Sequence, residues 1–485
     1  MPGQIVRVYP ASGANAMLPL TPANYYTPTI LFCGGIFIPD ELWGDYSYPY
    51  TDTWNIPASK DSQRLTPEPT DGSPVTYVQD DDLPIGRTMG QFIALPDGTF
   101  LLVNGAQNGT AGYAKMTKTT PTEAMPFGES LASGPVLQPA IYDPEAPAGS
   151  RWSTANLGSS TIPRMYHSSA LLLPDGSVMI AGSNPNIDYN PNAHFPTTYT
   201  AEYFYPPYFS SKTRPEPQNI PDTLSYGGNY FDITIPPTSY SGSANDAANN
   251  TKIWLIRPGF TTHAMNMGQR MLQLNHTYTV YANGTISLHV SQVPPNPNLL
   301  PPGPCMVFVA INRIPSVGKF VIVGNGMTGT QPTSLAAELP ANVLSTSASG
   351  TAPSSSSGNS NSSASPSHIG AIIGAVVAGI AAVGVLGGVF GFCLARRRRQ
   401  AAVADPASSY PISSAGFGGF TGREMRNSDS SAFMPLRHSN QHDDGSMLSP
   451  TQIDQFGPRP SSQFSQSGEF YLHGGDYISR SGTPR

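Results

Sequence analysis

Cysteine is scarce in this sequence: its 485 residues include only three, Cys33, Cys305 and Cys393. None of them stands in a C-x-x-C pair or at the spacing of a zinc site, which excludes a zinc-binding module and a disulfide-stapled scaffold. A single disulfide between Cys33 and Cys305 stays open, because the sequence alone does not say whether the two residues lie close together.

Charged residues are also scarce. They make up 12% of the chain, the formal net charge is −6 and the isoelectric point is near 5.8. A nucleic-acid-binding protein needs a basic surface, so this composition argues against DNA or RNA as a partner. The 48 glycines and 50 prolines instead favour an all-β, loop-rich secreted protein, although disordered segments share this bias.

The clearest folded unit is residues 164–186, RMYHSSALLLPDGSVMIAGSNPN. It predicts two short strands joined by Pro174-Asp175-Gly176, in which the proline sets φ for a turn and the glycine tolerates a positive φ. Tyr166 and His167 come just before the first strand. Adjacent side chains of a regular strand point to opposite faces, so these two could bind one metal only at a strand end or in a loop. The two strands are residues 169–173 and 177–181.

The same pattern occurs earlier in the chain. Residues 87–108, RTMGQFIALPDGTFLLVNGAQN, repeat the arginine, strand, LPDG and strand, and residues 25–35, YYTPTILFCGG, resemble a shorter third copy. Repeated units of this kind are typical of β-propeller blades, and kelch-type blades run about 50 residues. A closed propeller needs about four blades or more. Three copies therefore predict an incomplete kelch-type propeller over residues 1–207, with residues 36–80 as an insertion of little periodicity and residues 109–135 as a loop between blades.

The character of the sequence changes near Pro215. Short strand-like runs follow at the intervals of a β-sandwich, and Asn283-Gly284 between two of them is a strong hairpin turn. We therefore predict an immunoglobulin-like sandwich over residues 208–325. Its expected strands are residues 230–235, 252–257, 276–282, 285–290, 305–312 and 317–323.

An apolar segment follows the globular part. Residues 369–394 are 26 consecutive uncharged residues, enough to span a bilayer, and Arg396–Arg399 come directly after them. The positive-inside rule then places the C-terminus in the cytosol and the globular part outside the cell. The predicted order is a Ser-rich stalk (340–367), one transmembrane helix (368–394) and a disordered cytoplasmic tail (395–485).

Five N-x-S/T sequons precede the predicted span, as expected for a glycoprotein whose folded part lies outside the cell. They are at Asn108, Asn249, Asn275, Asn283 and Asn361. The first residues, MPGQIVRVYP, nevertheless lack the basic and apolar regions of a signal peptide. Together with the small number of blades, this predicts that an N-terminal part of the protein is missing from the sequence.

Three segments resemble one known family. They are RMYHSSALLLPDG, the loop PGFTTHAMNMGQR at residues 258–270, and GPCMVFVAINRIPSVGKFVIV at residues 303–323. Together they resemble the C-terminal half of the copper radical oxidases, glyoxal oxidase most closely and galactose oxidase more distantly. The resemblance covers about residues 4–325 and implies a propeller followed by an "early set" immunoglobulin-like domain.

The resemblance also implies a mononuclear copper site. Tyr166 would be the axial tyrosine, acting as the base that takes the substrate's hydroxyl proton. His167 and His263 would be the two imidazole ligands, the second delivered by a loop of the sandwich. Imidazole and oxygen donors in a tetragonal arrangement suit Cu(II). Without the family pattern, a tyrosine–histidine pair or a lone loop histidine is more often a packing feature than a ligand.

The family's fourth ligand is a tyrosine joined by a thioether bond to a cysteine, and this pair holds a radical. The sequence offers no candidate for this Tyr–Cys cofactor, since Cys33 matches a different cysteine of the family and Cys305 lies in the sandwich. The usual partner of the first cysteine falls where this chain has Ser62, so the family's disulfide is not expected. The other histidines of the globular part belong to no motif and are expected at surface or turn positions: His194, His276 and His289.

Three functions stay open on the sequence. A full-length form would oxidise small aldehydes or alcohols with O2 to give H2O2, whereas this chain, without the radical cofactor, is expected to be inactive. Alternatively, the chain is a non-catalytic, membrane-anchored binding module of the cell surface. As a third possibility, it is a transmembrane signalling protein whose Ser-rich tail binds cytosolic partners after phosphorylation, unless the tail is an inert anchor.

Overall fold

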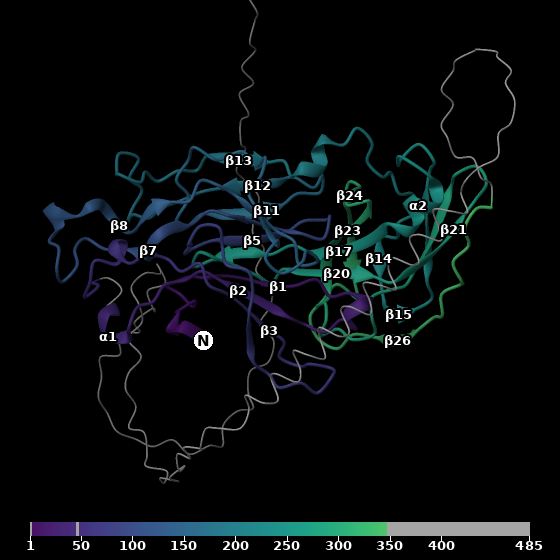
Figure 1. Cartoon of the computed structure of the whole chain (residues 1–485), viewed down its shortest axis with the longest axis horizontal. Coiled ribbons are helices and arrows are strands. Elements are labelled where there is room, and N and C mark those ends of the chain that lie inside the picture. The colour runs from purple at the N-terminus through teal and green to yellow at the C-terminus, as the bar shows by residue number, and fades with distance from the viewer. Residues whose placement is uncertain (1, 45–47, 347–485) are drawn as a thin grey trace, which may run out of the picture. The chain divides into compact units, whose positions relative to one another are not determined.

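The structure is a computed structural model that describes residues 2–44 and 48–346. This part of the chain is almost entirely β-structure, as the sequence predicts (Figure 1). Its helices are short: α1 (Asp40–Trp43), α2 (Ala244–Asn249), and the 3-10 helices η1 (Pro2–Gln4), η2 (Pro22–Asn24), η3 (Thr53–Asn55), η4 (Thr122–Ala124) and η5 (Pro207–Ser210).

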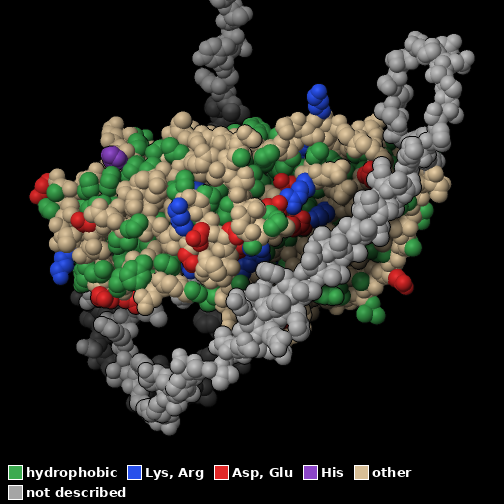
Figure 2. Space-filling view, in the orientation of Figure 1, with side chains coloured by type: hydrophobic (Ala, Val, Ile, Leu, Met, Phe, Trp, Pro, Cys, Tyr) green, Lys and Arg blue, Asp and Glu red, His purple; other side chains and the backbone are tan. Residues whose placement is uncertain are grey.

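The predicted transmembrane helix (368–394), the tail (395–485) and most of the stalk (340–367) lie outside the described residues. In the part of the chain that the structure describes, no helix has the length and apolar character needed to cross a membrane. On the face shown in Figure 2, charged side chains are few and the two signs are interspersed, in keeping with the low charge content of the sequence.

Three antiparallel sheets are built from the first part of the chain. In each sheet, strands that follow one another along the chain pair with one another, and β11, β12 and β13 lie side by side in Figure 1. The strands of the three sheets are β1 (Ala14–Met17), β2 (Ile30–Cys33), β3 (Ser62–Leu65) and β4 (Tyr77–Gln79); β5 (Gln91–Ala94), β6 (Phe100–Val103), β9 (Ala140–Tyr142) and β10 (Trp152–Ser153); and β11 (Ser169–Leu172), β12 (Val178–Ala181) and β13 (Ala201–Phe204).

Both predicted LPDG hairpins are confirmed. In the later copy, the Leu173 amide donates to the Ser177 carbonyl at 2.8 Å, and Gly176 has a φ of +90°. The earlier copy repeats this geometry, with the Leu95 amide donating to the Thr99 carbonyl at 2.8 Å. Glycine alone adopts such a φ without steric cost, so its place in the motif fixes where each strand reverses.

Two predictions for this part of the chain are wrong. Residues 36–80 are not an insertion of little periodicity, because β3 and β4 lie within them and complete the first sheet. Residues 109–135 do not form a simple loop either. They contribute to a two-stranded ribbon of β7 (Ala106–Tyr113) and β8 (Pro126–Pro135). The strands β3 and β4 read SQRL and YVQ, and such polar runs carry little alternation of the kind that marks a strand.

The sandwich confirms all six predicted strands, with shifts of one or two residues at their ends. It also contains strands that were not predicted, the last of which, Thr333–Ala336, lies beyond the predicted end of the domain at residue 325. The Asn283-Gly284 turn joins β21 to β22, and the Tyr281 amide donates to the Thr285 carbonyl at 2.9 Å. The strands are β14 (Thr223–Leu224), β25 (Lys319–Val323), β23 (Gly303–Ile311), β17 (Thr251–Arg257) and β20 (Arg270–Leu274), with β24 (Ile314–Pro315) beside β23; β16 (Phe231–Ile235), β22 (Ile286–Val290) and β21 (His276–Val280); and β15 (Tyr226–Gly228) with β26 (Thr333–Ala336).

Two central strands of the sandwich, β17 and β23, are buried on both faces. Along β17, Ile253 and Leu255 pack in the sandwich interior, whereas Trp254 and Ile256 pack against residues of the first sheets. Successive residues of a strand face opposite sides, so a strand with apolar neighbours on both sides needs an unbroken apolar run. This explains why the two strands read IWLI and CMVFVAI.

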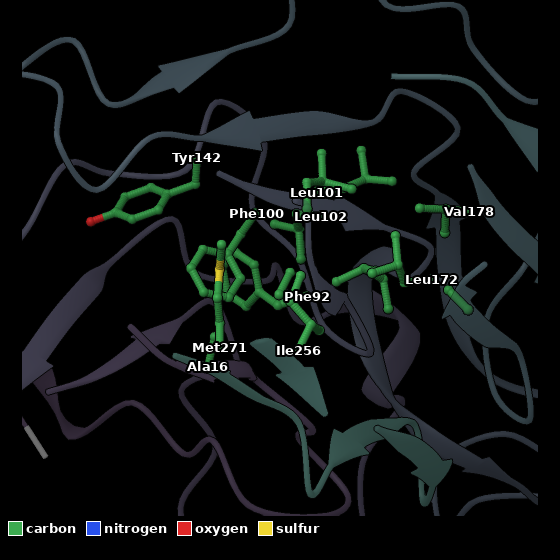
Figure 3. Close-up of a cluster of buried hydrophobic side chains, with 14 of the residues drawn as sticks. Ala16, Phe92, Phe100, Leu101, Leu102, Tyr142, Leu172, Val178, Ile256 and Met271 are labelled. Carbon is green, nitrogen blue, oxygen red and sulfur yellow. The ribbon is translucent and has the colours of Figure 1, made fainter. Parts of the chain in front are cut away.

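The apolar cluster that contains Trp254 and Ile256 joins the sandwich to the earlier sheets. Phe92 on β5 and Phe100 on β6 meet edge to face, with ring centroids 6.2 Å apart, and belong to one buried cluster with Ile256 and Met271 (Figure 3). Each large apolar side chain contributes about 1.5–3 kcal/mol when fully buried. Apolar burial therefore fixes the sandwich against the sheets that precede it.

The two cysteines of the described chain, Cys33 and Cys305, are buried and not joined to each other. Burial raises the pKa of each thiol to about 12, so both are protonated at neutral pH. Cys33 lies directly opposite Ser62 in the β2–β3 ladder. The Gly34 amide donates to the Asp61 carbonyl at 3.0 Å, which makes Cys33 and Ser62 a non-hydrogen-bonded pair.

We expect Ser62→Cys to form a disulfide with Cys33 when the protein folds in an oxidising buffer. Non-hydrogen-bonded partners have Cα atoms about 4.5 Å apart, within the range that a disulfide spans. The bond would close the loop between residues 33 and 62, which should raise the free energy of unfolding by about 3–4 kcal/mol. Urea unfolding with and without reductant measures this, and Cys33→Ser/Ser62→Cys is the control that cannot form the bond. A reductant-independent unfolding curve for Ser62→Cys would contradict the expectation.

The histidines outside the motifs do not all lie where the sequence predicts. His194 is exposed, as expected. His289 is a half-buried residue of β22, with Nδ1 2.7 Å from a carboxylate oxygen of Asp232. His276 begins β21, and burial lowers its pKa to about 4. The surface-or-turn prediction is therefore wrong for His276 and His289, because the strand pairing that half-buries them is not visible locally.

The lowered pKa of His276 predicts a pH-dependent stability. The native state disfavours the protonated imidazole. The stability that comes from keeping His276 neutral is therefore fully present above a pH of about 6.5 and is lost as the pH falls toward 4. At 1.36 kcal/mol per pKa unit, the loss is about 3 kcal/mol. Urea unfolding between pH 7 and 4 should show a shallower decline for His276→Gln than for the unmodified chain. The exposed-site control His194→Gln should keep the original slope, and equal slopes for all three proteins would refute the assignment.

Candidate metal centre

Tyr166 and His167 lie in an irregular segment that leads into β11. The Asn184 amide donates to the Tyr166 carbonyl at 2.8 Å, and His167 has a φ of +63°. This backbone departs from a regular strand, so the two adjacent side chains fall on one side, with ring centroids 3.9 Å apart. Tyr166 is buried and His167 is exposed. The two rings thus lie side by side at a strand end, where the sequence placed them, and their role as ligands of one metal stays a prediction.

A buried arginine holds this segment in place. Arg164 donates from Nε to the Glu202 carboxylate, from Nη1 to the Gly182 carbonyl and from Nη2 to the Thr200 carbonyl, each at 2.8 Å. The matching Arg87 of the earlier copy likewise donates to backbone carbonyls, and burial lowers its pKa to about 9. The arginine of each repeat therefore fixes the backbone just before the first strand of its sheet.

His263 occupies the tip of a two-stranded ribbon, β18 (Phe260–Thr262) and β19 (Met265–Met267). The two tip residues, His263 and Ala264, have φ values of +54° and +59°, the conformation of a type I′ turn. Such turns normally use Asn and Gly, so a His-Ala tip is strained. Thr262 Oγ1 lies 2.8 Å from His263 Nδ1, which leaves Nε2 as the nitrogen that can face a metal.

The ribbon is fixed to the first two sheets by side-chain hydrogen bonds. Ser12 donates to the His263 carbonyl at 3.0 Å, and Asn266 Nδ2 donates to the Phe92 carbonyl at 2.8 Å. The Ala94 amide donates to Gln269 Oε1 at 2.9 Å. These bonds hold the ribbon against β5 and against the segment that precedes β1. His263 can share a site with residues of the first part of the chain only if the ribbon is held in this way.

Tyr9 connects the two parts of the site. Its ring meets His263 edge to face, with centroids 5.1 Å apart, and its Oη lies 3.5 Å from Tyr166 Oη. Tyr113 packs beside Tyr166 and His167, with centroid distances of 6.2 and 6.4 Å. The structure therefore brings all three predicted residues, Tyr166, His167 and His263, into one aromatic cluster.

The pKa shifts fit this proximity. Burial raises the pKa of Tyr166 well above its usual range, and the neighbouring Tyr9 raises it further. Partial desolvation lowers the pKa of His167, and the charge of His263 lowers it further. Both shifts favour neutral side chains in the metal-free protein, and a neutral imidazole is the form that binds a metal.

Tyr9 and Tyr113 are missed by the sequence reasoning. A signal for Tyr9 exists, because in each of the three sheets of the first part of the chain an arginine stands two residues before a Tyr or Met ahead of the first strand. The three segments are Arg7-Val8-Tyr9, Arg87-Thr88-Met89 and Arg164-Met165-Tyr166. Tyr9 is therefore the counterpart of Tyr166 in the first copy, which the sequence comparison placed too late by starting it at Tyr25.

The donors in this cluster are two imidazoles and phenol oxygens. Across residues 2–44 and 48–346, no group of three or more His, Cys, Asp or Glu side chains is placed to hold a metal. The mixed nitrogen and oxygen set suits Cu(II), which accepts imidazole and prefers a tetragonal arrangement. A separate cavity of about 330 Å³ lies between the second and third sheets, beside Asn104, Ser160, Glu202 and Tyr205.

Two family models match most of the described residues. The model described as "Glyoxal oxidase N-terminus" matches residues 1–208, and the model "Galactose oxidase-like, Early set domain" matches residues 214–323. The chain belongs to the glyoxal oxidase and galactose oxidase-like family. Its sandwich is the early set domain that the resemblance implied, whereas the ligand roles of Tyr166, His167 and His263 stay predictions.

Two curated relatives and one solved structure are similar to parts of this chain. Aldehyde oxidase GLOX of Vitis pseudoreticulata is 34% identical over 65% of this chain and 54% of its own length. Aldehyde oxidase GLOX1 of Arabidopsis thaliana is 32% identical over 65% of this chain and 48% of its own length. A solved fungal alcohol oxidase of the AA5 family, in complex with copper, is 21% identical, with a TM-score of 0.45 over 64% of this chain and 53% of that chain. The chain thus spans about half the length of the curated relatives that it matches.

Proposed function

We propose that this chain carries the copper site of a copper radical oxidase of the glyoxal oxidase type. The observation that supports this is the convergence of His263, from the sandwich ribbon, with Tyr166 and His167, from the segment before β11. Two imidazoles and a phenol are donors that suit Cu(II). Bound copper would supply one-electron redox chemistry with O2.

The chain's own groups have distinct tasks in this proposal. Tyr166 Oη, as a phenolate bound to the metal, would take the hydroxyl proton of the substrate, the role that the family resemblance implies. Thr262 orients the His263 ring through Nδ1. The exposed edges of His167 and His263 leave this side of the cluster open to a small molecule.

The proposed substrates are small aldehydes or alcohols, in line with the names of the two plant relatives. In a longer form, two electrons and two protons would pass from the alcohol or hydrated aldehyde to O2 and give H2O2. We propose that the present chain binds copper but does not turn over, because the Tyr–Cys radical cofactor is not encoded in it.

The proposal extends to the setting of the site. The three sheets would be blades of a kelch-type propeller that is incomplete in this chain, since all three are antiparallel meanders of three or four strands. Residues 368–394 would anchor the chain in a membrane, with the glycosylated globular part outside the cell and the C-terminus in the cytoplasm.

The test uses the purified full chain, residues 1–485. Metal-free protein is titrated with Cu(II), and bound copper is counted and examined by electron paramagnetic resonance. We expect one tightly bound copper per chain and no peroxide from glyoxal or methylglyoxal. Absence of bound copper would overturn the proposal and favour the non-catalytic binding module. Peroxide formation by this chain would overturn the claim that it is inactive.

A further inference from the structure

The three arginine-led segments place Tyr9 and Tyr166 at equivalent positions. Arg7 pairs with Asp61 and Arg164 pairs with Glu202. A buried arginine therefore holds each segment in place just before the first strand of its sheet. Two residues after each arginine, the side chain points into the same cluster, which also contains Met89 from the second copy. The fold thus supplies two phenols, and not one, to this cluster.

The spacing of the two phenol oxygens is informative. Tyr9 Oη and Tyr166 Oη are 3.5 Å apart, whereas hydroxyl hydrogen bonds cluster near 2.7–2.8 Å. Two donors that each lie about 2.0–2.2 Å from one metal are about 2.8–3.1 Å apart at the right angles of a tetragonal site and about 3.3–3.6 Å apart at tetrahedral angles. The observed separation is therefore long for a hydrogen bond and lies in the tetrahedral range for two ligands of one ion.

The contacts of Tyr9 also point toward a shared ion. Its ring lies edge-on to His263 at 5.1 Å and tilted against Tyr166 at 6.2 Å, so it contacts predicted ligands from both parts of the chain, and its hydroxyl lies 3.5 Å from Tyr166 Oη. A divalent cation removed from water needs negatively charged partners. A second phenolate would supply that charge within a cluster made largely of aromatic and apolar side chains.

We propose that Tyr9 Oη is the fourth protein donor of the metal site in this chain. Together with Tyr166 Oη and the imidazoles of His167 and His263 it completes a set of two nitrogen and two oxygen ligands. Tyr9 and Tyr166 would each release their phenol proton to solvent on binding the ion. This inference rests on the proposed function, namely that the site takes copper.

The test compares Tyr9→Phe with Tyr199→Phe in the full chain. Both variants lose one phenol hydroxyl, but Tyr9 has its oxygen beside Tyr166 Oη, whereas Tyr199 is an exposed residue outside the cluster. We expect Tyr9→Phe to lower Cu(II) affinity at least about 10-fold, to change the copper resonance spectrum and to weaken the phenolate-to-copper absorption band. Tyr199→Phe should leave all three unchanged. Circular dichroism of the metal-free variants checks that each one folds.

The outcomes separate the two proposals. If the unmodified chain binds no copper, the proposed function fails and this inference fails with it. If it binds copper and Tyr9→Phe has the same affinity and spectrum, only the role of Tyr9 is overturned. Tyr9→His provides a second variant, because imidazole is also a donor. It should recover most of the affinity that Tyr9→Leu loses, and equal affinities for these two variants would contradict ligation by residue 9.

Discussion

Replacing His263 with alanine is expected to lower the Cu(II) affinity of the full chain at least about 100-fold. Removing a residue that merely orients a metal ligand costs about 10–100-fold, so loss of a ligand should reach or exceed that range. His263 is the donor that the sandwich ribbon brings to the cluster, and the Ser12 side chain, which donates to the His263 carbonyl, holds it there. Equilibrium titration against a competing chelator measures the change.

Two further variants separate ligation from a general disturbance of the protein. His194→Ala removes an exposed histidine outside the cluster, and copper affinity should not change. Thr262→Val removes the partner of His263 Nδ1 and should reduce affinity by about 10-fold, the cost of losing a ligand-orienting hydrogen bond. Unchanged affinity in His263→Ala would remove this residue from the metal site.

Trp254→Ala is expected to lower the free energy of unfolding by about 3–5 kcal/mol. This is the usual cost of truncating a large buried aromatic residue, because apolar burial is lost and a cavity is left behind. Trp254 is 1% exposed and lies in the core that joins β17 to the first sheets. Chemical unfolding followed by circular dichroism measures the loss.

The matched control is Phe320→Ala, an aromatic truncation on β25 of the same sheet. Phe320 is 57% exposed, so its loss should change the unfolding free energy by less than about 0.5 kcal/mol. A comparably small effect for Trp254→Ala would show that the core between sandwich and sheets contributes little to stability. A separate early transition in that variant would show that the sandwich and the sheets unfold independently.

Local sequence was sufficient for the hairpins and the central strands. The LPDG turns and Asn283-Gly284 reverse the chain through residues with restricted or unusual φ, and this preference acts within a few residues. The strands β17 and β23 can be predicted from their apolar runs, because both of their faces are buried. The resemblance to a family, carried by three short segments, then indicated Tyr166, His167 and His263.

Elements whose pairing is set by distant residues escaped prediction. The polar strands β3 and β4 form because β3 pairs with the edge of β2 and β4 then pairs with β3, whereas their own sequences show little alternation. The β7–β8 ribbon contains bulges and glycines, which hide the period of a strand. His276 and His289 are half-buried by strand pairing that no local pattern reveals.

The sequence by itself determined which residue types are available for a metal and which turns and central strands form, because these depend on local conformational preference and composition. Only the tertiary structure decided that Tyr9, Tyr166, His167 and His263 meet. Their proximity depends on the packing of β17 and β23 against β5 and β6, which places the His263 ribbon beside β5. Contacts between segments so far apart in the chain arise from burial of shared apolar surface, a property that no single segment carries.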